Sequence, residues 1–318
     1  MNQLLQFAIR EMDAKCVAFE EKSETGHRVP DGVEEFLDMP YQGAGGVPLA
    51  VDIFRAKDRS LRPLPVVIMV HGGGLVVGTR KLARTFCENL AERGFLVFAP
   101  EYRRVPEANA IEEIGDIFAA FSFVSRALEK YGGDPERVAV ASESAGSFLS
   151  IYAVAATVSP VLREALGLPT APSLHVRTIA CFSGMFYTAR KDSVGLLYAR
   201  NIYGEKKKDS SFMKLMNPEC HEVMNCLPPV FLVGSDADFL KGYTKRYAEA
   251  LRQAEHPCKL VYYTNNKTLT HAFPALKPEL PESSDVLDKL VDWVLRKHHT
   301  GTRAQEVIKQ RYDINDHR

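Results

Sequence analysis

The amino-acid sequence predicts an α/β fold with a mostly parallel, doubly wound central sheet. Short apolar runs alternate with helical stretches along most of the chain, and runs of this length are typical of strands buried on both faces. Before them, two segments of alternating polarity flank a glycine-rich turn, which predicts an antiparallel hairpin. At 318 residues the chain is long enough for one large domain of this class with a small accessory layer.

The strands are expected in a simple order along the chain. The hairpin joins Val33–Met39 to Pro48–Phe54 through the turn Gly43-Ala44-Gly45-Gly46. The remaining strands are expected at the continuous apolar runs Val66–Val70, Phe95–Ala99, Val138–Ala141, Ile179–Phe182, Val230–Val233 and Leu260–Tyr263.

One helix between these strands has a clear period. Apolar residues recur at helical spacing from Ile111 to Leu128, and Asp134-Pro135 then turns the chain into the next strand. Glu112 and Glu113 are neighbours on this helix, so they cannot face each other across a substrate. This argues against a glycosidase with paired carboxylates, and a solvated helix face explains both residues.

Two stretches do not fit the alternation of strands and helices, namely residues 1 to about 30 and about 185 to 226. We expect both to form a small helical cap over the carboxyl ends of the strands, on one domain that spans 1–318. Their apolar and aromatic residues would line an acyl or alcohol pocket, or would pack the cap onto the core. The tail from about 302 to 318 is expected to be a short surface helix or an oligomer contact, and the sequence does not choose between them.

The composition indicates a small-molecule partner. Hydrophobic residues make up 46% of the chain and charged residues 25%, and the formal net charge is zero, which gives no reason to expect nucleic acid or an anionic membrane as partner. The chain start lacks a basic, apolar leader and no run is long enough to span a membrane, so we expect a cytoplasmic protein. The six cysteines form no C-x-x-C pair and are expected to be buried thiols.

Two glycine-containing motifs point to acyl transfer. His71-Gly72-Gly73-Gly74 directly follows an apolar run, where a glycine loop can turn backbone N–H groups inward as an oxyanion hole. Ser144 follows another run, on a predicted strand-to-helix turn that would present its hydroxyl as a nucleophile. Ser142 stands where the G-x-S-x-G pattern has its first glycine, but it lacks small neighbours at both required positions, so Ser144 is the preferred nucleophile.

The chain also offers a base and an acid in the expected order. His271 lies on a loop after the last predicted strand, where it can reach a serine above the sheet. The acid should follow the preceding strand, where Asp236 and Asp238 are both present. Spacing alone does not separate these two aspartates.

These motifs together resemble the hormone-sensitive-lipase family of carboxylesterases in the α/β-hydrolase superfamily. The resemblance runs from about Val66 to Leu295. It rests on the HGGG loop at 71–74, Tyr102 to Glu107 at the family's Y-R-L-A-P-E segment, Asp134-Pro135-Glu136-Arg137-Val138, the Ser144 turn, Asp238-Phe239-Leu240 at D-P-L, and His271-Ala272-Phe273 at H-G-F.

The resemblance implies an α/β-hydrolase fold and a role for each matching residue. These roles are Ser144 as nucleophile, His271 as base, Asp238 rather than Asp236 as acid, and the backbone N–H groups of Gly73, Gly74 and Ala145 as oxyanion hole. Ser142, Glu143, Ser147 and Ala272 depart from the family pattern, which bears on substrate range and rate.

The sequence therefore predicts a serine carboxylesterase for short- to medium-chain esters that needs no metal or organic cofactor. The expected partner is a small-molecule ester, and a homo-oligomer stays open. The alternatives are a deacetylase of sugar or other natural acetyl esters, peptide or amide cleavage, and a non-catalytic small-molecule binding protein on the same fold. The presence of His271 speaks against the last of these.

Overall fold

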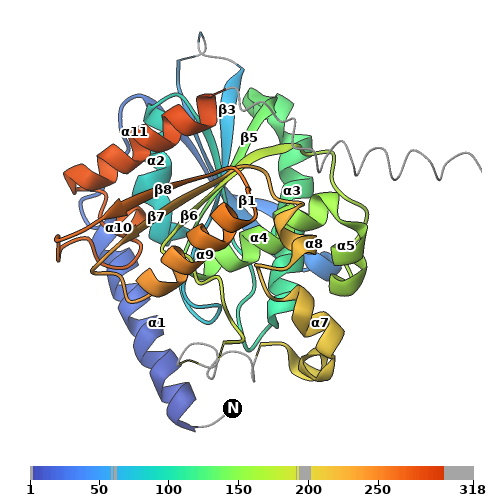
Figure 1. The fold of residues 1–318 in the computed structure, drawn as a ribbon. Coiled ribbons are helices and arrows are strands. Elements are labelled where there is room, and N and C mark those ends of the chain that lie inside the picture. Colours follow the sequence, from blue (N-terminus) through green and yellow to red (C-terminus); the bar gives the residue numbers. More distant parts are fainter. Residues whose placement is uncertain (1–2, 59, 61–62, 191, 193–201, 297–318) are drawn as a thin grey trace, which may run out of the picture.

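The computed structural model describes residues 3–58, 60, 63–190, 192 and 202–296 (Figure 1). Its sheet has eight strands in the order β1-β2-β4-β3-β5-β6-β7-β8. Their bounds are β1 Val33–Gln42, β2 Pro48–Ala56, β3 Leu64–Val70, β4 Leu96–Pro100, β5 Gly133–Glu143, β6 Val176–Phe182, β7 Val230–Ser235 and β8 Cys258–Tyr263. β2 pairs antiparallel with β1 and β4, and all other pairs are parallel. The predicted mostly parallel sheet with an opening hairpin is thus confirmed.

The predicted turn at Asp134-Pro135 lies inside β5. Leu64 of β3 pairs with Gly133, whereas Val66 pairs with Val138. Four residues of β5, 134–137, therefore lie opposite the single residue Pro65 of β3. They form a bulge, after which the two strands pair regularly again. Proline supplies no backbone N–H for the ladder, which makes this a suitable place for the irregularity.

Helices cover both faces of the sheet (Figure 1). The α-helices are α1 Gln3–Glu24, α2 Arg84–Glu92, α3 Ala110–Tyr131, α4 Ala145–Val158, α5 Pro160–Leu166, α7 Ser210–Leu215, α8 His221–Met224, α9 Lys241–Gln253, α10 Phe273–Leu276 and α11 Pro281–Leu295. Short 3-10 turns lie at Ala44–Gly46, Arg80–Ala83 and Gly204–Lys208. The helices α2 and α11 pack on one face, and α3, α4 and α9 pack on the other.

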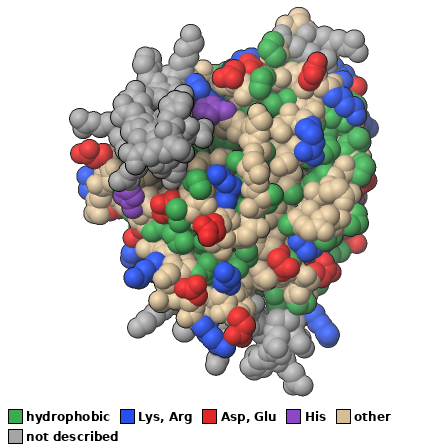
Figure 2. Space-filling model, turned by 90° about the vertical axis from the view of Figure 1, so that its right-hand side faces the viewer, with side chains coloured by type: hydrophobic (Ala, Val, Ile, Leu, Met, Phe, Trp, Pro, Cys, Tyr) green, Lys and Arg blue, Asp and Glu red, His purple; other side chains and the backbone are tan. Residues whose placement is uncertain are grey.

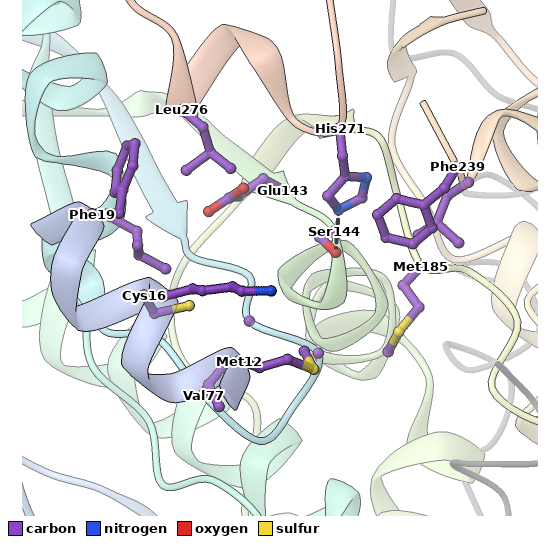
Figure 3. A pocket seen from close by; sticks show the side chains of 15 residues that line it. Met12, Cys16, Phe19, Val77, Glu143, Ser144, Met185, Phe239, His271 and Leu276 are labelled. Carbon is purple, nitrogen blue, oxygen red and sulfur yellow. Dashed lines mark hydrogen bonds between the residues drawn. The ribbon is translucent and has the colours of Figure 1, made fainter. Parts of the chain in front are cut away.

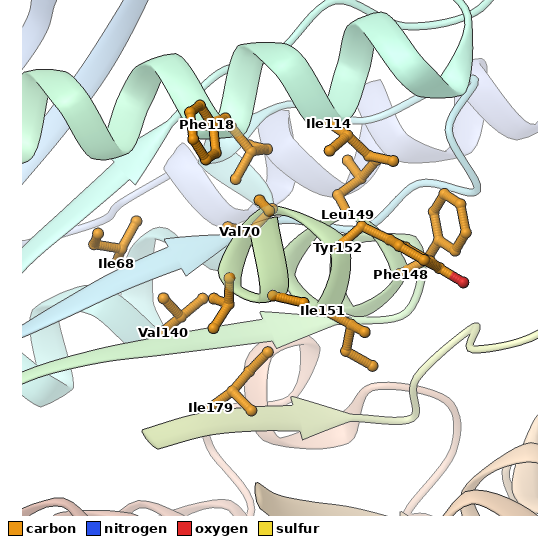
Figure 4. Close-up of a cluster of buried hydrophobic side chains, with 14 of the residues drawn as sticks. Ile68, Val70, Ile114, Phe118, Val140, Phe148, Leu149, Ile151, Tyr152 and Ile179 are labelled. Atoms are coloured by element: carbon orange, nitrogen blue, oxygen red, sulfur yellow. The ribbon is translucent and has the colours of Figure 1, made fainter. Parts of the chain in front are cut away.

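The core consists of two layers separated by the sheet. In β3, Ile68 and Val70 face the layer under α3 and α4, where Phe118 and Phe148 pack (Figure 4). The alternate residue Val67 faces the layer under α2 and α11. Every residue of β3 is buried, because successive side chains enter different apolar layers. This double burial explains why β3 is a continuous apolar run in the sequence, whereas β8, at the edge of the sheet, is only partly buried although its run looks similar.

The two acidic residues at the start of α3 have different environments. Asn109 accepts hydrogen bonds from the N–H groups of Ile111 and Glu112, and the Glu112 carboxylate accepts from the Asn109 N–H, which forms a capping box. Glu113 instead is fully buried, and burial raises its pKa well above the usual range. The expectation of a solvated helix face is therefore wrong for Glu113.

The first helix touches the rest of the molecule through its second half. One Glu20 oxygen accepts hydrogen bonds from the N–H and hydroxyl of Thr79, at 3.1 and 2.8 Å, and Glu24 pairs with Lys81 at 2.9 Å. The helix ends at Glu24, before the expected boundary near residue 30. Residues 191 and 193–201 of the second expected cap stretch, and the tail 302–318, lie outside the described residues.

The surface carries mixed charges. On the face shown in Figure 2, basic and acidic side chains are interspersed, in keeping with the 40 basic and 40 acidic residues of the chain. All six cysteines are free thiols, but Cys16, Cys220 and Cys258 are only partly buried, contrary to the expectation for all six. Among the described helices, none is long and apolar enough to cross a membrane.

Candidate active site

Four loops meet at the carboxyl edge of the parallel strands. The glycine motif starting at His71 follows β3, Ser144 follows β5, Asp238 follows β7 and His271 follows β8. Because these strands are parallel and lie side by side, the loops that leave their carboxyl ends come together at one edge of the sheet. The structure thus brings together residues that are up to 200 positions apart.

Ser144 lies on a sharp turn between β5 and α4. Its backbone has φ 48° and ψ −118°, a strained conformation that lifts the side chain above the sheet. A Cβ at Gly146 would lie 2.3 Å from the carbonyl oxygen of Val70, and one at Gly72 would lie 2.9 Å from the Ser144 Cβ. Both positions therefore need glycine for the turn to pack against β3.

Ser144, His271 and Asp238 form a continuous hydrogen-bonded chain (Figure 3 shows its first link). His271 Nε2 lies 2.8 Å from Ser144 Oγ, and His271 Nδ1 lies 2.7 Å from Asp238 Oδ1. Since a carboxylate only accepts, Nδ1 carries the proton and Nε2 is left to accept from the serine hydroxyl. The arrangement can remove the serine proton as the oxygen attacks an electrophile.

The two candidate aspartates are separated by the structure. Asp238 is buried, and its Oδ1 accepts from His271 and from the Leu240 N–H at 2.9 Å. Burial alone would raise its pKa, but the hydrogen bond and charge of His271 and the Leu240 N–H outweigh it, so the pKa of Asp238 lies below its usual value. Asp236 instead accepts hydrogen bonds from the Tyr262 hydroxyl at 3.0 Å and from the Lys245 ammonium group at 3.3 Å, and it does not contact the histidine.

Ser142 is occupied in packing and does not approach His271. Its hydroxyl donates to the Ala180 carbonyl at 3.1 Å and lies 3.2 Å from the Ser147 hydroxyl. Both serines, which replace family glycines, are fully buried between β5, α4 and β6. The two serines that replace the family glycines therefore hydrogen-bond to each other and to the Ala180 carbonyl, in a small polar cluster below Ser144.

The glycine loop and the start of α4 lie beside Ser144. Gly73 and Gly74 have positive φ values of 108° and 63° and line the same cavity as Ser144, and Ala145 is the first residue of α4. The carbonyl of Gly73 accepts hydrogen bonds from the N–H groups of Val76 and Val77. These two bonds close the loop and fix the orientation of the peptide groups around Gly73. Backbone N–H groups at such positions suit a developing oxyanion.

His71 holds this loop in place from below. Its Nδ1 lies 2.9 Å from the Gly72 carbonyl and its Nε2 lies 3.1 Å from Glu101, while its ring stacks on Tyr102 at 4.3 Å. The Tyr102 hydroxyl donates to the carbonyls of His71 and Gly72 at 3.0 and 3.1 Å. These contacts occupy both ring nitrogens of His71, so the residue orders the loop and is not free to act on a substrate.

The pairing of Glu101 predicts a pH-dependent contribution to stability. Burial alone would raise its pKa, but the charge and hydrogen bond of His71, with help from Arg104, lower the pKa of Glu101 to about 2. Because this pKa lies below the ordinary value of 4.5, the ionised carboxylate stabilises the fold above about pH 4.5, and the contribution is lost as the pH falls towards 2. Glu101→Gln is expected to lower the free energy of unfolding, measured with urea, by about 3 kcal/mol at pH 7. At pH 3.5 the loss should be smaller by at least about 1 kcal/mol. An equal loss of unfolding free energy at both pH values would contradict the proposed pairing of Glu101 with His71.

Two residues near the triad were not predicted from the sequence. Ser183 follows β6 with φ 52°, and its hydroxyl oxygen accepts from the N–H of Ala272, the residue after His271, at 2.9 Å. The Phe239 ring lies 4.3 Å from the His271 ring although its side chain is 73% exposed. Their only sequence signals were a serine after a predicted strand and an aromatic residue beside Asp238.

The triad opens into one cavity of about 580 Å³. In Figure 3, Met12, Cys16 and Phe19 of α1 lie on one side of Ser144, and Met185 and Phe239 lie on the other. Most of the remaining wall is apolar, so the cavity suits the hydrocarbon parts of a small ligand. Within the described part of the chain, no group of three or more His, Cys, Asp or Glu side chains is placed to hold a metal ion.

The sheet order, the strained serine turn and the glycine loop define a protein of the α/β-hydrolase fold. The family model described as the alpha/beta hydrolase fold matches residues 67–275, well over half of the 318 residues. The chain belongs to this family, within the hormone-sensitive-lipase group of α/β hydrolases that the sequence motifs indicated. Both the predicted fold and the predicted resemblance are confirmed.

Relatives and solved structures agree with this membership. A probable isoprenylcysteine α-carbonyl methylesterase of Arabidopsis thaliana is 26% identical over 238 residues, covering 70% of this chain and 48% of the relative. A carboxylesterase of Mycobacterium tuberculosis is 26% identical over 235 residues, 70% of each chain. The crystal structure of esterase B from Lactobacillus rhamnosis shares the fold, with a TM-score of 0.82 over 100% of both chains at 21% identity. The chain spans only 48% and 63% of the length of the first two plant relatives it matches.

Proposed function

We propose that this protein is a serine carboxylesterase that hydrolyses short- to medium-chain carboxylic esters. The observation that carries the proposal is the hydrogen-bonded chain from Asp238 through His271 to Ser144, with distances of 2.7 and 2.8 Å. The names of the relatives, which include carboxylesterases and methylesterases, support the same class of reaction. The low pKa of Asp238 suits a carboxylate that stays ionised while the imidazole takes up a proton.

The proposed reaction has two steps. Ser144 Oγ attacks the ester carbonyl as His271 Nε2 takes its proton, and Gly73, Gly74 and Ala145 donate backbone hydrogen bonds to the oxyanion. The carbon–oxygen bond to the alcohol then breaks, and His271 returns the proton to the leaving alcohol. Water attacks the acyl-enzyme by the same route, which releases the carboxylic acid and restores the serine hydroxyl. No metal or organic cofactor takes part in these steps.

We further propose that α1 acts as the cap, together with the described parts of 185–226, on a single domain. The cavity residues Met12, Cys16 and Phe19 come from α1, and Met185 comes from the segment after β6. Because acyl and alcohol groups must share about 580 Å³, long acyl chains should fit poorly.

The test is hydrolysis of 4-nitrophenyl esters from acetate to palmitate. We expect kcat/KM to be highest for short to medium chains and to fall by about tenfold or more at palmitate, as the chain outgrows the cavity. Rates that keep rising to palmitate would contradict the chain-length proposal and favour a lipase. A folded protein that hydrolyses none of the esters would contradict the esterase proposal and favour a specialised substrate or a binding role.

A further inference from the structure

Lys15 is a charged residue on the otherwise apolar cavity face of α1. It lines the cavity together with Met12, Cys16 and Phe19, and the spacing of positions 12, 15, 16 and 19 places all four on one face of the helix. Its side chain is exposed, and among the described residues it has no hydrogen bond or ion pair. The ammonium group can therefore meet whatever enters the cavity.

The other charged groups of the cavity wall are already engaged. His271 is held between Ser144 and Asp238. Glu143 is buried, one of its oxygens accepts the Gly72 N–H at 3.1 Å, and burial raises the pKa of its carboxyl, which favours the neutral form. The described cavity wall thus presents one unmatched positive charge among apolar side chains. In such surroundings an opposite charge on a ligand is attracted more strongly than in bulk water.

We propose that Lys15 makes the cavity selective for esters that carry one negative charge, such as a carboxylate, apart from the reacting carbonyl. This inference rests on the proposed esterase function and names a substrate class for it. The apolar walls hold the hydrocarbon part of such an ester, and Lys15 binds its anionic end. A lysine that only extends past the cavity into solvent would not affect the choice between charged and neutral esters.

The experiment uses two matched substrate pairs. 4-Nitrophenyl monoadipate against 4-nitrophenyl hexanoate places the charge on the acyl side, and 4-acetoxybenzoate against 4-acetoxybenzamide places it on the alcohol side. Each is measured with wild type, Lys15→Gln, Lys15→Arg and the control Lys22→Gln. Lys22 lies on α1, is exposed and does not line the cavity, so this control removes the same charge from the same helix.

We expect Lys15→Gln to lower the ratio of charged to neutral kcat/KM by about tenfold in at least one pair. Lys15→Arg should keep the ratio, Lys22→Gln should leave it unchanged, and added salt should reduce it in wild type more than in Lys15→Gln. Equal ratios in wild type, Lys15→Gln and Lys22→Gln, with neutral esters still hydrolysed, would overturn this inference alone. If wild type hydrolyses none of the four esters, the proposed function falls and the inference falls with it.

Discussion

Replacing Ser144 with alanine is expected to lower kcat/KM for a short-chain ester by about 10⁴- to 10⁶-fold. Alanine removes the hydroxyl oxygen that lies 2.8 Å from His271 Nε2, and a water molecule would not be held as an equally well-placed nucleophile. The backbone strain at φ 48° is the same for serine and alanine, so the thermal midpoint should change little. The measurement is 4-nitrophenyl butyrate hydrolysis with a melting curve for each protein.

Ser142→Ala is the matched control for this variant. Ser142 lies two residues away, is buried and bonds Ser147 and the Ala180 carbonyl instead of the triad. Its loss is expected to cost stability of about 1 kcal/mol while kcat/KM stays within a few-fold of wild type. If Ser142→Ala rather than Ser144→Ala abolished hydrolysis, the assignment of the nucleophile would be wrong.

Gly73→Ala is expected to lower kcat by about 10²- to 10³-fold and to destabilise the fold by about 1–3 kcal/mol. The added Cβ would lie 1.8 Å from the Val77 carbonyl oxygen, which is backbone and cannot rotate away as a side chain would. The loop must therefore open, and the proposed oxyanion donors at Gly73 and Gly74 move from their places. KM for short esters should change less than kcat, because the donors act mainly on the transition state.

Gly45→Ala is the control that shows the effect of a left-handed backbone conformation without a steric clash of the added Cβ. Gly45 also has a positive φ, of 71°, but a Cβ there would meet nothing within 4 Å. This variant should lose only about 1 kcal/mol of stability for its left-handed conformation and should keep full activity. A Gly73→Ala enzyme with the turnover of Gly45→Ala would rule out a role for the loop in holding the oxyanion.

The sequence predicted the strands and the three triad side chains for a physical reason. Strands buried on both faces must be continuous apolar runs, as β3 is, and the loops after parallel strands must meet at one edge of the sheet. Ser144, Asp238 and His271 each lie on a loop that follows one of the predicted strands. Their proximity therefore follows from the predicted order of parallel strands.

Contacts between distant segments could not be predicted in this way. Asp236 and Asp238 are both near the end of β7, and only the path of the loop decides which of them meets His271. The sequence does not distinguish Glu113 from its exposed neighbour Glu112, because hydropathy indicates which residues prefer water, whereas burial depends on how α3 packs in the folded protein. Likewise, nothing local to Lys15 reveals that α1 lies across the cavity.

The way α1 is attached has a consequence for how this protein could diverge. The proposed catalytic residues lie on loops that leave the sheet, whereas one wall of the cavity comes from a helix that contacts the rest of the protein through Glu20 and Glu24. Substitutions at Met12, Lys15 or Phe19 change that wall without disturbing the strands. Substitutions in α1 can therefore change the substrate specificity during evolution while the proposed catalytic residues are kept. For the same reason, mutant libraries aimed at a new specificity should begin with this helix.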